Sequence, residues 1–363
     1  MKAVIIAGGL GTRLRPLTYN IPKPIVPVAN RPFILHQIEL LKQHGITEII
    51  LSLHYLTEEI RAVLGDGRKF GVKLYYSLEK QALGTGGAVK NAEEYFVDED
   101  LLLVFNGDVL TDINLAQVIA FHKKNKARAT LTLTRVADPT AYGLIVTDKH
   151  GVVSQFIEKP SWEQVSNVKK IGTADTINAG LYALDPKVFR NIPAGVEYSF
   201  ERQLFPGLLE KGELVCGFIS DRYWIDIGKP NQYRQAHEAI MRNEVTARVL
   251  GTRVDNRAWI GEHARIAKSA KLLGPSIIGQ KVVIGDETKI KDYTVLGDRV
   301  QVGKDSVLTN TIIWEGTKVG SHVSLDGCII GYDCVIEDFA AIGPGVVLAD
   351  RTVIKKGSVL CSK

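Results

Sequence analysis

The stretch IGEHARIAKSAKLLGPSIIGQKVVIGDETKIKDYTVL, residues 260–296, carries an aliphatic side chain at every sixth position. The series runs from Ile260 to Leu308 without a change of step and continues to Leu360 with two steps of five residues. All eighteen positions are Ile, Leu or Val, and eight of them are followed by Gly. Neither an α-helix nor an alternating strand has a period of six. The pattern predicts short strands joined by corners, and we expect the glycines to occupy corners that need a positive φ.

This pattern resembles the hexapeptide repeat of left-handed parallel β-helices, in which three repeats form one triangular turn. Eighteen repeats therefore predict about six turns. The resemblance favours a structural role, in which a stacked aliphatic core orients or oligomerises the rest of the chain. Acyl-CoA chemistry, which such β-helices also carry, is a weaker alternative. His263 and His322 could serve as bases, but no insertion interrupts the repeat.

The N-terminal two thirds of the chain has a different pattern, in which short apolar runs alternate with helical ones. Strands are predicted at 2–7, 46–53, 72–78, 101–105 and 129–136, and helices at 32–44, 57–64, 86–96 and 115–124. Strict alternation requires crossover connections, so we expect an α/β fold with a Rossmann-like, mostly parallel sheet and helices on both faces. Ligands of such sheets bind beyond the carboxyl ends of the strands. The two patterns predict a domain at 1–242, a linker at 243–256 and a β-helix domain at 257–363.

Composition excludes several classes of protein. The 363 residues include 45 Lys and Arg against 40 Asp and Glu, and the net charge of +5 divides into +3 for residues 1–256 and +2 for the rest. Because neither part is a basic arm, we expect no nucleic acid partner. The four cysteines lack zinc or disulfide-framework spacing, and no apolar run approaches the roughly 18 residues of a membrane span. These features predict a reduced cytoplasmic protein without membrane contact.

The first predicted strand runs into a glycine-rich turn, GGLGTRL at residues 8–14. Glycines at such a turn let backbone N–H groups approach phosphate oxygens. The turn is not a Walker A loop, because no Lys-Ser/Thr pair follows. It is not a dinucleotide fingerprint either, because Leu14 replaces the third Gly and Pro16 prevents immediate helix formation. Taken alone, the turn is also compatible with a purely structural role.

The continuation of this turn resembles the signature of a known enzyme family. Residues 8–32, GGLGTRLRPLTYNIPKPIVPVANRP, are similar to the signature of the sugar-nucleotide pyrophosphorylases, nucleotidyltransferases that join a sugar 1-phosphate to a nucleoside triphosphate. Five further motifs follow in the family's order: ALGTGGA at 82–88, FNGD at 105–108, FIEKP at 156–160, INAG at 177–180 and WIDIG at 224–228. The resemblance covers the whole chain and implies that residues 1–242 form the catalytic domain.

Two carboxylates are the candidate metal ligands. Asp108 follows the predicted strand 101–105 at its carboxyl end, although a lone Asp there could also cap a helix. Asp226 lies between apolar neighbours, a costly position for a charge without a partner. Two converging carboxylates suit Mg²⁺, which takes oxygen ligands and keeps some waters and substrate phosphates. The resemblance assigns this role to Asp108 and Asp226.

The resemblance also implies the remaining site residues, each of which could otherwise be a solvated charge or a turn residue. It places Arg13 on the leaving pyrophosphate and Lys23 near the α-phosphate, and these two join Asp108 and Asp226 as catalytic residues. The expected nucleotide-binding residues are Ala7, Gly8, Gly9, Gly11, Thr12, Arg13, Lys23, Leu83, Gly84 and Thr85. The expected sugar-phosphate-binding residues are Gly143, Glu158, Lys159 and Asn178.

The reaction implied by the resemblance needs no general base. The second pKa of a sugar 1-phosphate is about 6, so its oxygen is ready to attack the α-phosphorus near neutral pH. The protein then has to align the groups and stabilise the developing charge.

The LGT, FxEKP and INAG motifs, with Ser199, Glu201 and Phe205-Pro206, resemble the mannose-1-phosphate guanylyltransferases that end in a β-helix. We therefore expect GTP and mannose 1-phosphate as substrates. Glucose-1-phosphate adenylyl- or thymidylyltransferase activity is the alternative. A non-catalytic regulatory subunit is another, although Arg13, Lys23, Asp108, Lys159 and Asp226 are all present. The β-helix is expected to support a homo-oligomer. No role is predicted for Cys328 and Cys334.

Overall fold

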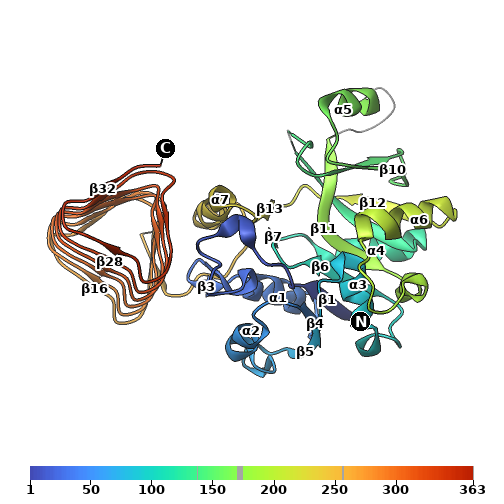
Figure 1. The fold of residues 1–363 in the computed structure, drawn as a ribbon, viewed down its shortest axis with the longest axis horizontal. Coiled ribbons are helices and arrows are strands. Elements are labelled where there is room, and N and C mark those ends of the chain that lie inside the picture. The colour runs from blue at the N-terminus through green and yellow to red at the C-terminus, as the bar shows by residue number, and fades with distance from the viewer. Residues whose placement is uncertain (137, 170–174, 256, 363) are drawn as a thin grey trace. The chain divides into compact units, whose positions relative to one another are not determined.

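The computed structural model describes residues 1–136, 138–169, 175–255 and 257–362, and for Glu158 the backbone alone. Its contacts divide the chain into two compact units (Figure 1). The first, called the sheet unit below, comprises Met1–Gly9 and Gln37–Trp224. The second, called the β-helix unit, comprises Leu10–His36 and Ile225–Lys363. No helix in the described part of the chain is long and apolar enough to cross a membrane.

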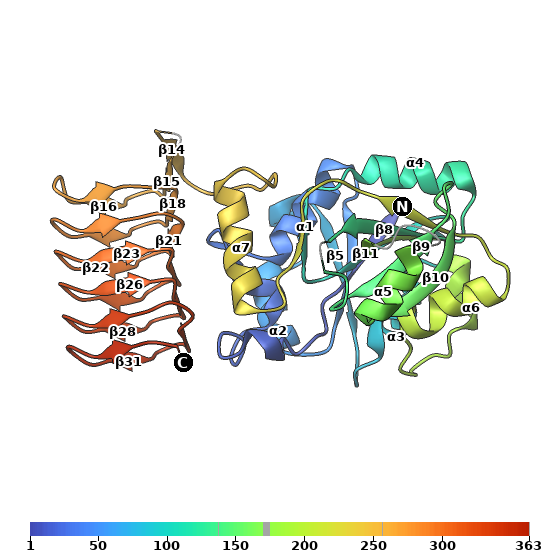
Figure 2. The same cartoon turned by 90° about the horizontal axis from the view of Figure 1, so that it is seen from above.

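A nine-stranded mixed sheet forms the centre of the sheet unit (Figure 2). Its strands are β1 (Lys2–Ile6), β4 (Glu48–Leu53), β5 (Lys73–Leu78), β6 (Leu102–Asn106), β8 (Ala129–Arg135), β9 (Gly143–Thr147), β10 (Val153–Glu158), β11 (Thr176–Leu184) and β12 (Val215–Ile219). The main path runs β10-β9-β11-β6-β1-β4-β5, and β8 pairs with both β11 and β12. Strands β6, β1, β4 and β5 are parallel, whereas β11 is antiparallel to β6, β8 and β9.

Helices pack on this sheet, the first four of them near the ranges predicted from the sequence and the last two outside any predicted helix. They are α1 (Ile34–Gln43), α2 (Thr57–Leu64), α3 (Gly84–Asn91), α4 (Leu115–Asn125), α5 (Trp162–Lys169) and α6 (Phe205–Glu210). Helix α3 contacts β1 and β4, α4 contacts β8, β11 and β12, and α6 contacts β10 and β12. The main apolar core includes Val4, Ile50 and Val104 of the sheet, with Val89 of α3 and Phe205 of α6. The Rossmann-like α/β class is therefore confirmed, with β10 and β11 as antiparallel additions.

The order of the strands locates the place where a ligand can bind. The chain leaves β1 towards β4 and β5 on one side, and then returns to β6 on the other side of β1. Ile6 of β1 pairs with Asn106 of β6, so these two strands end side by side. In open α/β sheets, such a reversal of strand order opens a crevice beyond the carboxyl ends. The glycine-rich turn after β1 and Asp108 after β6 both start at this point.

Three sheets, wound as successive triangular coils, form the β-helix (Figures 1 and 2). Their strands pair in parallel, apart from the first strand of the first sheet, which is antiparallel to its neighbour. The first sheet contains β14 (Thr252–Val254), β15 (Ala258–Ile260), β18 (Ser276–Ile278), β21 (Thr294–Leu296), β24 (Ile312–Ile313), β27 (Ile329–Ile330) and β30 (Val347–Leu348). The second contains β16 (Arg265–Ile266), β19 (Val283–Ile284), β22 (Gln301–Val302), β25 (Lys318–Val319), β28 (Val335–Ile336) and β31 (Val353–Ile354). The third contains β17 (Lys271–Leu272), β20 (Lys289–Ile290), β23 (Val307–Thr309), β26 (Ser324–Asp326), β29 (Ala341–Ile342) and β32 (Val359–Leu360).

The period of six corresponds directly to these three sheets. Successive members of the series fall on successive sheets, so that Ile278 pairs with Leu296, Ile284 with Val302 and Ile290 with Leu308. Most of the series is fully buried in one continuous core. Both five-residue steps, Leu308 to Ile313 and Leu325 to Ile330, join the third sheet to the first. The tighter coils therefore shorten the same corner and keep the columns aligned.

The glycines that follow the aliphatic positions have a different role from the one expected. None of the eight has a positive φ, whereas His263, Lys281, Tyr293 and Phe339 are among the non-glycine corner residues that do. A Cβ added at Gly297 would lie 2.5 Å from the backbone nitrogen of Glu315 in the next coil. Similar contacts of 2.4 to 2.8 Å occur at Gly261, Gly279, Gly285, Gly303, Gly320 and Gly331. These glycines are needed for close coil stacking, so the prediction of a positive φ was wrong.

The first β-helix sheet is covered on its outer side by other parts of the same unit. Five residues of this sheet each precede an inward-facing residue, so their side chains point to the outer side of the β-helix. All five are nevertheless buried: Trp259, Ile277, Val295, Ile312 and Ile329. Helix α7 (Pro230–Met241) and the segment 10–36 belong to this unit, and both form hydrogen bonds with the β-helix. That segment contains two 3-10 turns, at Thr12–Leu14 and Lys23–Ile25, and the strands β2 (Pro27–Val28) and β3 (Arg31–Pro32). Asn30 donates to the Leu296 carbonyl at 2.7 Å.

A chain of hydrogen bonds connects the β-helix with the segment 10–36. The Trp314 indole donates to the Tyr233 hydroxyl of α7 at 2.9 Å, and this hydroxyl donates to the Pro27 carbonyl. Tyr233 is fully buried, and burial raises its pKa well above the ordinary value, so the phenol keeps its proton. The β-helix therefore stabilises the segment that carries Arg13 and Lys23.

Candidate active site

The turn that carries Asp108 is held from two sides. It joins β6 to β7 (Val109–Thr111), and the Gln37 side chain of α1 donates to the Asn106 and Val109 carbonyls, both at 2.9 Å. A Cβ at Gly107 would lie 2.5 Å from the Ile6 carbonyl oxygen, so only glycine lets the turn approach β1 this closely. Asp108 is half-buried at the carboxyl end of β6, as predicted.

The glycine-rich turn after β1 begins beside this carboxylate. The Gly107 N–H donates to the Ile6 carbonyl at 2.8 Å, which brings the FNGD turn against the end of β1. A Cβ at Gly8 would lie 3.1 Å from Glu79 Oε1, whereas one at Gly9 would meet nothing within 4 Å. No described protein atom therefore requires glycine at position 9. The exposed backbone there is accessible to an external group such as a phosphate.

Glu79 links the glycine-rich turn to the LGT motif. It lies directly after β5 and is 9% exposed. One carboxylate oxygen accepts the Leu83 N–H at 3.0 Å, and the other accepts the Ser52 hydroxyl at 3.1 Å. The sequence interpretation did not select this residue. Its position at the end of a predicted strand is the signal that could have identified it.

The glycines of the LGTGG motif pack on a neighbouring segment of the chain. The Tyr198 carbonyl accepts the Gly86 and Gly87 N–H groups at 2.7 and 3.0 Å, and the Tyr198 N–H donates to the Leu83 carbonyl at 2.9 Å. A Cβ at Gly87 would lie 2.5 Å from the Val196 carbonyl oxygen. Thr85 donates to Glu201 at 3.1 Å and accepts the Phe200 N–H at 2.8 Å. Leu83, Gly84 and Thr85 therefore form a loop that is fixed by residues 198–201.

The predicted sugar-phosphate residues lie on two adjoining strands and a turn. Gly143 of β9 pairs with Glu158 of β10, and the Lys159 N–H donates to the Tyr142 carbonyl at 2.9 Å. Lys159 is exposed and adopts a φ of 48° at the end of β10. Asn178 of β11 donates to the Tyr182 hydroxyl at 2.9 Å. A small pocket is lined by Gly143, Asn178 and Glu201 among others. The side chain of Glu158 lies outside the described part of the structure.

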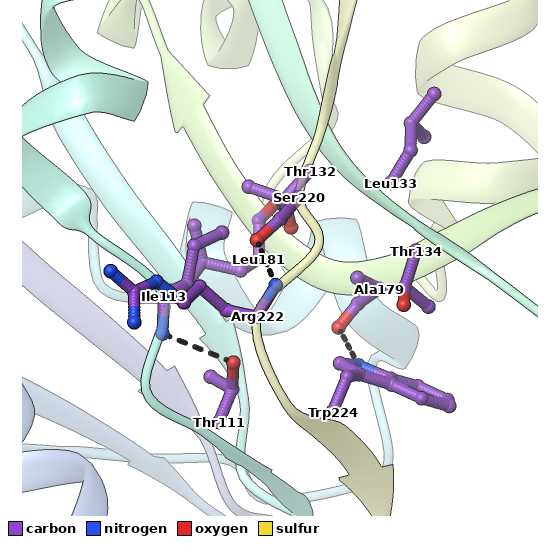
Figure 3. A pocket seen from close by; sticks show the side chains of 10 residues that line it. All are labelled: Thr111, Ile113, Thr132, Leu133, Thr134, Ala179, Leu181, Ser220, Arg222 and Trp224. Atoms are coloured by element: carbon purple, nitrogen blue, oxygen red, sulfur yellow. Dashed lines mark hydrogen bonds between the residues drawn. The ribbon is translucent and has the colours of Figure 1, made fainter. Parts of the chain in front are cut away.

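A second pocket is lined by Ala179 and Trp224, among others (Figure 3). The Trp224 indole donates to the Ala179 carbonyl at 2.8 Å, and its ring meets Tyr142 edge-on with the centroids 5.6 Å apart. This space is only about 10 Å³, enough for about one water molecule, and the small pocket at Gly143 is no larger. Trp224 fixes the start of the WIDIG motif to β11.

The β-helix unit carries the remaining candidate residues. Thr18 donates to the Gly11 carbonyl at 2.8 Å, and a Cβ at Gly11, where φ is 63°, would lie 3.1 Å from the Lys23 Cβ. Lys23 is 9% exposed, whereas Thr12 and Arg13 are exposed. The loop 11–23 therefore folds back on itself and brings Gly11 close to Lys23.

Asp226 ends β13 (Trp224–Asp226) and accepts a hydrogen bond from Gln232 of α7. A Cβ at Gly228 would lie 2.8 Å from the Asp226 carboxylate and 3.2 Å from the Arg13 guanidinium. Because Gly228 has no side chain, the Asp226 carboxylate and the Arg13 guanidinium can both lie close to it. The structure brings together Arg13 and Asp226 in this unit, and Asp108, Gly8 and Gly9 in the sheet unit.

The available oxygen ligands limit which metal ion could bind. The described residues contain no group of three or more His, Cys, Asp or Glu side chains arranged for a metal. Asp108 and Asp226 offer carboxylate oxygens alone, without the imidazole or thiolate that a transition metal favours. Such sparse oxygen ligands fit a hard divalent cation that takes its other ligands from water and substrate phosphates.

Family models match the chain in two consecutive regions. A model described as nucleotidyl transferase matches residues 2–243. A second, described as the EIF2B subunit epsilon LbH domain, matches residues 255–360 and confirms the left-handed β-helix.

Relatives resemble the chain over most of its length. It is 34% identical over 94% of its length to a UTP--glucose-1-phosphate uridylyltransferase of Synechocystis sp., covering 90% of that protein. It is 33% identical over 99% of its length to a probable mannose-1-phosphate guanylyltransferase 3 of Oryza sativa subsp. japonica, covering 98% of that protein. The crystal structure of HddC from Yersinia pseudotuberculosis complexed with GMP-PN is 32% identical, with a TM-score of 0.55 over 65% of this chain and 97% of HddC.

Proposed function

Because the chain belongs to the nucleotidyl transferase family, we propose that it is a mannose-1-phosphate guanylyltransferase. The reaction joins GTP and mannose 1-phosphate to give GDP-mannose and pyrophosphate. The observation that carries the proposal is the position of Asp108 and the open Gly8-Gly9 turn at neighbouring strand ends, where the strand order reverses.

The proposed reaction is a direct displacement at the α-phosphorus. A phosphate oxygen of the sugar 1-phosphate forms the new P–O bond while the bond to the β-phosphate bridging oxygen breaks, and pyrophosphate leaves with the electron pair. Since the attacking oxygen carries no proton near neutral pH, no general base is needed. The protein aligns the two groups in line and stabilises the negative charge that develops.

Each candidate residue has a proposed part in this displacement. Arg13 binds the leaving pyrophosphate and Lys23 the α-phosphate, since both are cations on a loop shaped by Gly11. The triphosphate is bound by the backbone of Ala7, Gly8, Gly9, Gly11 and Thr12, and the base by Leu83, Gly84 and Thr85. Gly143, Glu158 and Asn178 bind the sugar, and the exposed Lys159 ammonium binds its phosphate.

Nucleotidyltransferases of this family generally use a divalent metal, and we propose Mg²⁺ here. Asp108 and Asp226 would hold it, because Mg²⁺ accepts a site with few carboxylates. When bound, the ion neutralises phosphate charge in the ground and transition states.

The choice of GTP and mannose 1-phosphate is supported by the relatives. The Oryza sativa protein carries that name over nearly the full length of this chain, and HddC was crystallised with GMP-PN. A second candidate is UTP with glucose 1-phosphate, favoured by the Synechocystis protein at a similar identity. The same phosphate and metal residues would serve either pair.

A substrate matrix distinguishes these possibilities. Purified protein with Mg²⁺ is incubated with each of five nucleoside triphosphates and with mannose 1-phosphate or glucose 1-phosphate, and pyrophosphate release is measured. We expect kcat/KM to be highest for GTP with mannose 1-phosphate. Preference for another pair would replace the substrate assignment, and release with no pair would refute the activity.

The quaternary arrangement and cellular location stay predictions. A homo-oligomer formed through the β-helix is tested by light scattering during size-exclusion chromatography. The cytoplasmic location is tested by cell fractionation.

A further inference from the structure

The Glu201 carboxylate connects two parts of the sheet unit that are distant in the sequence. One of its oxygens accepts the Thr85 hydroxyl at 3.1 Å and the Ser199 hydroxyl at 2.8 Å. The other accepts the Tyr182 hydroxyl at 3.2 Å. Thr85 belongs to the proposed base loop, and Tyr182 lies on β11 beside the proposed sugar residue Asn178. Glu201 therefore holds hydroxyl groups from both substrate subsites.

The connection continues on the sugar side of Glu201. The Asn178 amide donates to the Tyr182 hydroxyl at 2.9 Å, and the Gly180 N–H donates to the Asn178 side-chain oxygen at 3.0 Å. The two contacts fix the orientation of the Asn178 amide. Tyr182 is fully buried, and burial together with the neighbouring Glu201 raises the pKa of its phenol well above the ordinary value. The phenol therefore stays a proton donor towards Glu201.

The end of the strand that carries Asp108 lies close to the INAG turn. A Cβ at Gly180 would lie 2.7 Å from the Asn106 amide nitrogen, so the glycine of the INAG motif makes room for the Asn106 side chain. Asn106 precedes Asp108 by two residues. Tyr182 itself accepts a hydrogen bond from Asn178 while it donates to Glu201.

The nucleotide side of Glu201 is equally constrained. Thr85 accepts the Phe200 N–H at 2.8 Å while it donates to Glu201, and Tyr198 binds the backbone on both sides of Thr85. A displacement of Glu201 would therefore move the base loop. Tyr198 and Phe200 contact the loop through backbone atoms, and the Phe200 ring also packs edge-on against the Tyr182 ring, with the centroids 5.4 Å apart.

We propose that Glu201 is a positioning residue that couples the sugar subsite to the nucleotide subsite, through Tyr182 and Asn178 on one side and Thr85 on the other. The proposal rests on the proposed function, since it takes residues 83–85 as the base loop and Asn178 as a sugar contact. A sugar phosphate that binds Asn178 thereby acts, through the same hydrogen bonds, on the loop that binds the nucleotide. The two substrates bind with positive coupling as a result.

A double-mutant cycle tests the coupling. Tyr182→Phe removes the hydroxyl on the sugar side. We expect the KM for the nucleotide, on the opposite side of Glu201, to rise roughly 5- to 10-fold, which is the scale of the net loss of one typical hydrogen bond. Glu201→Gln should raise KM for both substrates by roughly 10-fold or more. In the Glu201→Gln background, Tyr182→Phe should have little further effect on the nucleotide KM.

A second variant and a matched control keep the test decisive. Thr85→Val changes a half-buried side chain and should raise the sugar-phosphate KM although Thr85 lies in the nucleotide loop. Glu197→Gln, an exposed carboxylate four residues before Glu201, should leave both KM values unchanged. Conservative replacement by Glu201→Asp should recover part of the loss, because it restores a charge acceptor. KM is measured because it does not depend on the fraction of folded enzyme.

Each outcome has a defined meaning. If Tyr182→Phe and Thr85→Val each change only the KM on their own side, the coupling is refuted and Glu201 is merely structural. If the wild type acts on a pair other than GTP and mannose 1-phosphate, KM is measured for that pair, and only the substrate assignment fails. If the wild type acts on no pair, both the proposed function and the coupling are refuted.

Discussion

Asp108 is the residue on which the proposed chemistry depends most directly. Its turn is fixed by Gln37 and by the close approach of Gly107 to β1, so the carboxylate has a defined position before any substrate binds. Asp226 is similarly supported by Gln232 and lies near Arg13 around Gly228. Because these contacts fix the surroundings of both carboxylates, we expect an Asp→Asn substitution to change the charge at the site and not the fold.

Asp108→Asn and Asp226→Asn should each lower kcat by roughly 10³-fold or more, on the scale found when a group that stabilises transition-state charge is removed. The side-chain volume is kept, so the thermal midpoint should stay within a few degrees of the wild type. Steady-state assays with saturating Mg²⁺ and differential scanning calorimetry provide the two measurements. Asp98→Asn, an exposed site, serves as the control. Wild-type turnover in either variant would remove that residue from the proposed metal site.

His237 makes stability depend on pH. It is fully buried in α7, and burial, with a contribution from His36, lowers its pKa from 6.5 to about 4. Because the folded pKa lies below the unfolded one, neutral His237 stabilises the fold above pH 6.5, and this stability is lost as the pH falls towards 4. The difference corresponds to roughly 3 kcal/mol in the free energy of unfolding.

Urea unfolding of the wild type and of His237→Gln at pH 7.5 and pH 4.5 measures this effect. The wild type should lose roughly 2 to 3 kcal/mol more between these pH values than the variant does. His150→Gln removes an exposed histidine and should retain the wild-type pH dependence. Equal pH dependence of all three proteins would show that His237 does not titrate in this way.

Sequence patterns predicted the residues at strand ends better than the residues that support them. Asp108 could be selected because it follows an apolar run, and the structure places it at the carboxyl end of β6. Gln37 was overlooked, although a polar residue on the apolar face of a predicted helix is a recognisable signal. Glu201 meets Thr85 from 116 positions away in the chain, and no local pattern contains that distance.

At the scale of single elements, the β-helix coils are governed by their close spacing. Gly297→Ala places a Cβ 2.5 Å from the Glu315 nitrogen, and a clash with backbone cannot be relieved by a side-chain rotation. We expect the free energy of unfolding to fall by roughly 1 to 3 kcal/mol, the usual range for overpacking. Chemical denaturation measures this change.

Gly343→Ala is the matched control for that prediction. It also follows an inward aliphatic residue, but its nearest contact is 3.4 Å, and neither glycine has a positive φ. It should cost much less than Gly297→Ala. Equal destabilisation by both variants would mean that the clash with the next coil is not the reason for glycine.

The helices and strands could be predicted where one face of each is buried, because a buried face produces a regular spacing of apolar residues. Helix α2 matches its expected bounds of 57–64, and the eighteen aliphatic positions fall on the three β-helix sheets. The conformation of the corners was not predictable in this way. Tyr293 and Phe339 adopt a positive φ that their residue types disfavour, because the stacked coils determine the backbone there.

At the scale of the molecule, the contact-based units are not continuous in sequence. Segment 10–36 belongs with the C-terminal coils, whereas the residues on both sides of it belong with the sheet. The contact-based units therefore differ from the linear division at 243–256, which stays a prediction from the change of pattern. Hydrogen bonds such as Tyr233 to Pro27 link positions 206 residues apart, and periodicity contains no information about them.

Tyr233→Phe tests whether the β-helix supports the phosphate loop. The variant leaves the Trp314 indole N–H and the Pro27 carbonyl without their shared partner, which should cost roughly 1 to 3 kcal/mol of stability. Because Pro27 follows the turn that carries Lys23, the nucleotide KM should rise as well. Denaturation and steady-state kinetics measure the two effects.

Tyr293→Phe provides the comparison within the same unit. Its hydroxyl accepts a hydrogen bond from the exposed Arg242 at 2.9 Å, so stability should change by less than about 0.5 kcal/mol. The nucleotide KM should stay at the wild-type value. An unchanged nucleotide KM in Tyr233→Phe would show that the β-helix contributes stability alone.

The aligned columns of the β-helix also restrict how this part of the protein can change length over evolution. Each inward residue lies above its equivalent one coil away, 17 or 18 positions along the chain. Loss of a single hexapeptide would move every later strand to a different side of the triangle and would separate Trp314 from Tyr233. Gain or loss of a whole coil would keep each later strand on its own side. Helix α7 reaches as far as the coil of Gly327, whose carbonyl accepts a hydrogen bond from Arg234 at 2.8 Å. Coils beyond this contact can therefore be added or removed as complete modules, whereas earlier coils are fixed in number by their contacts with α7.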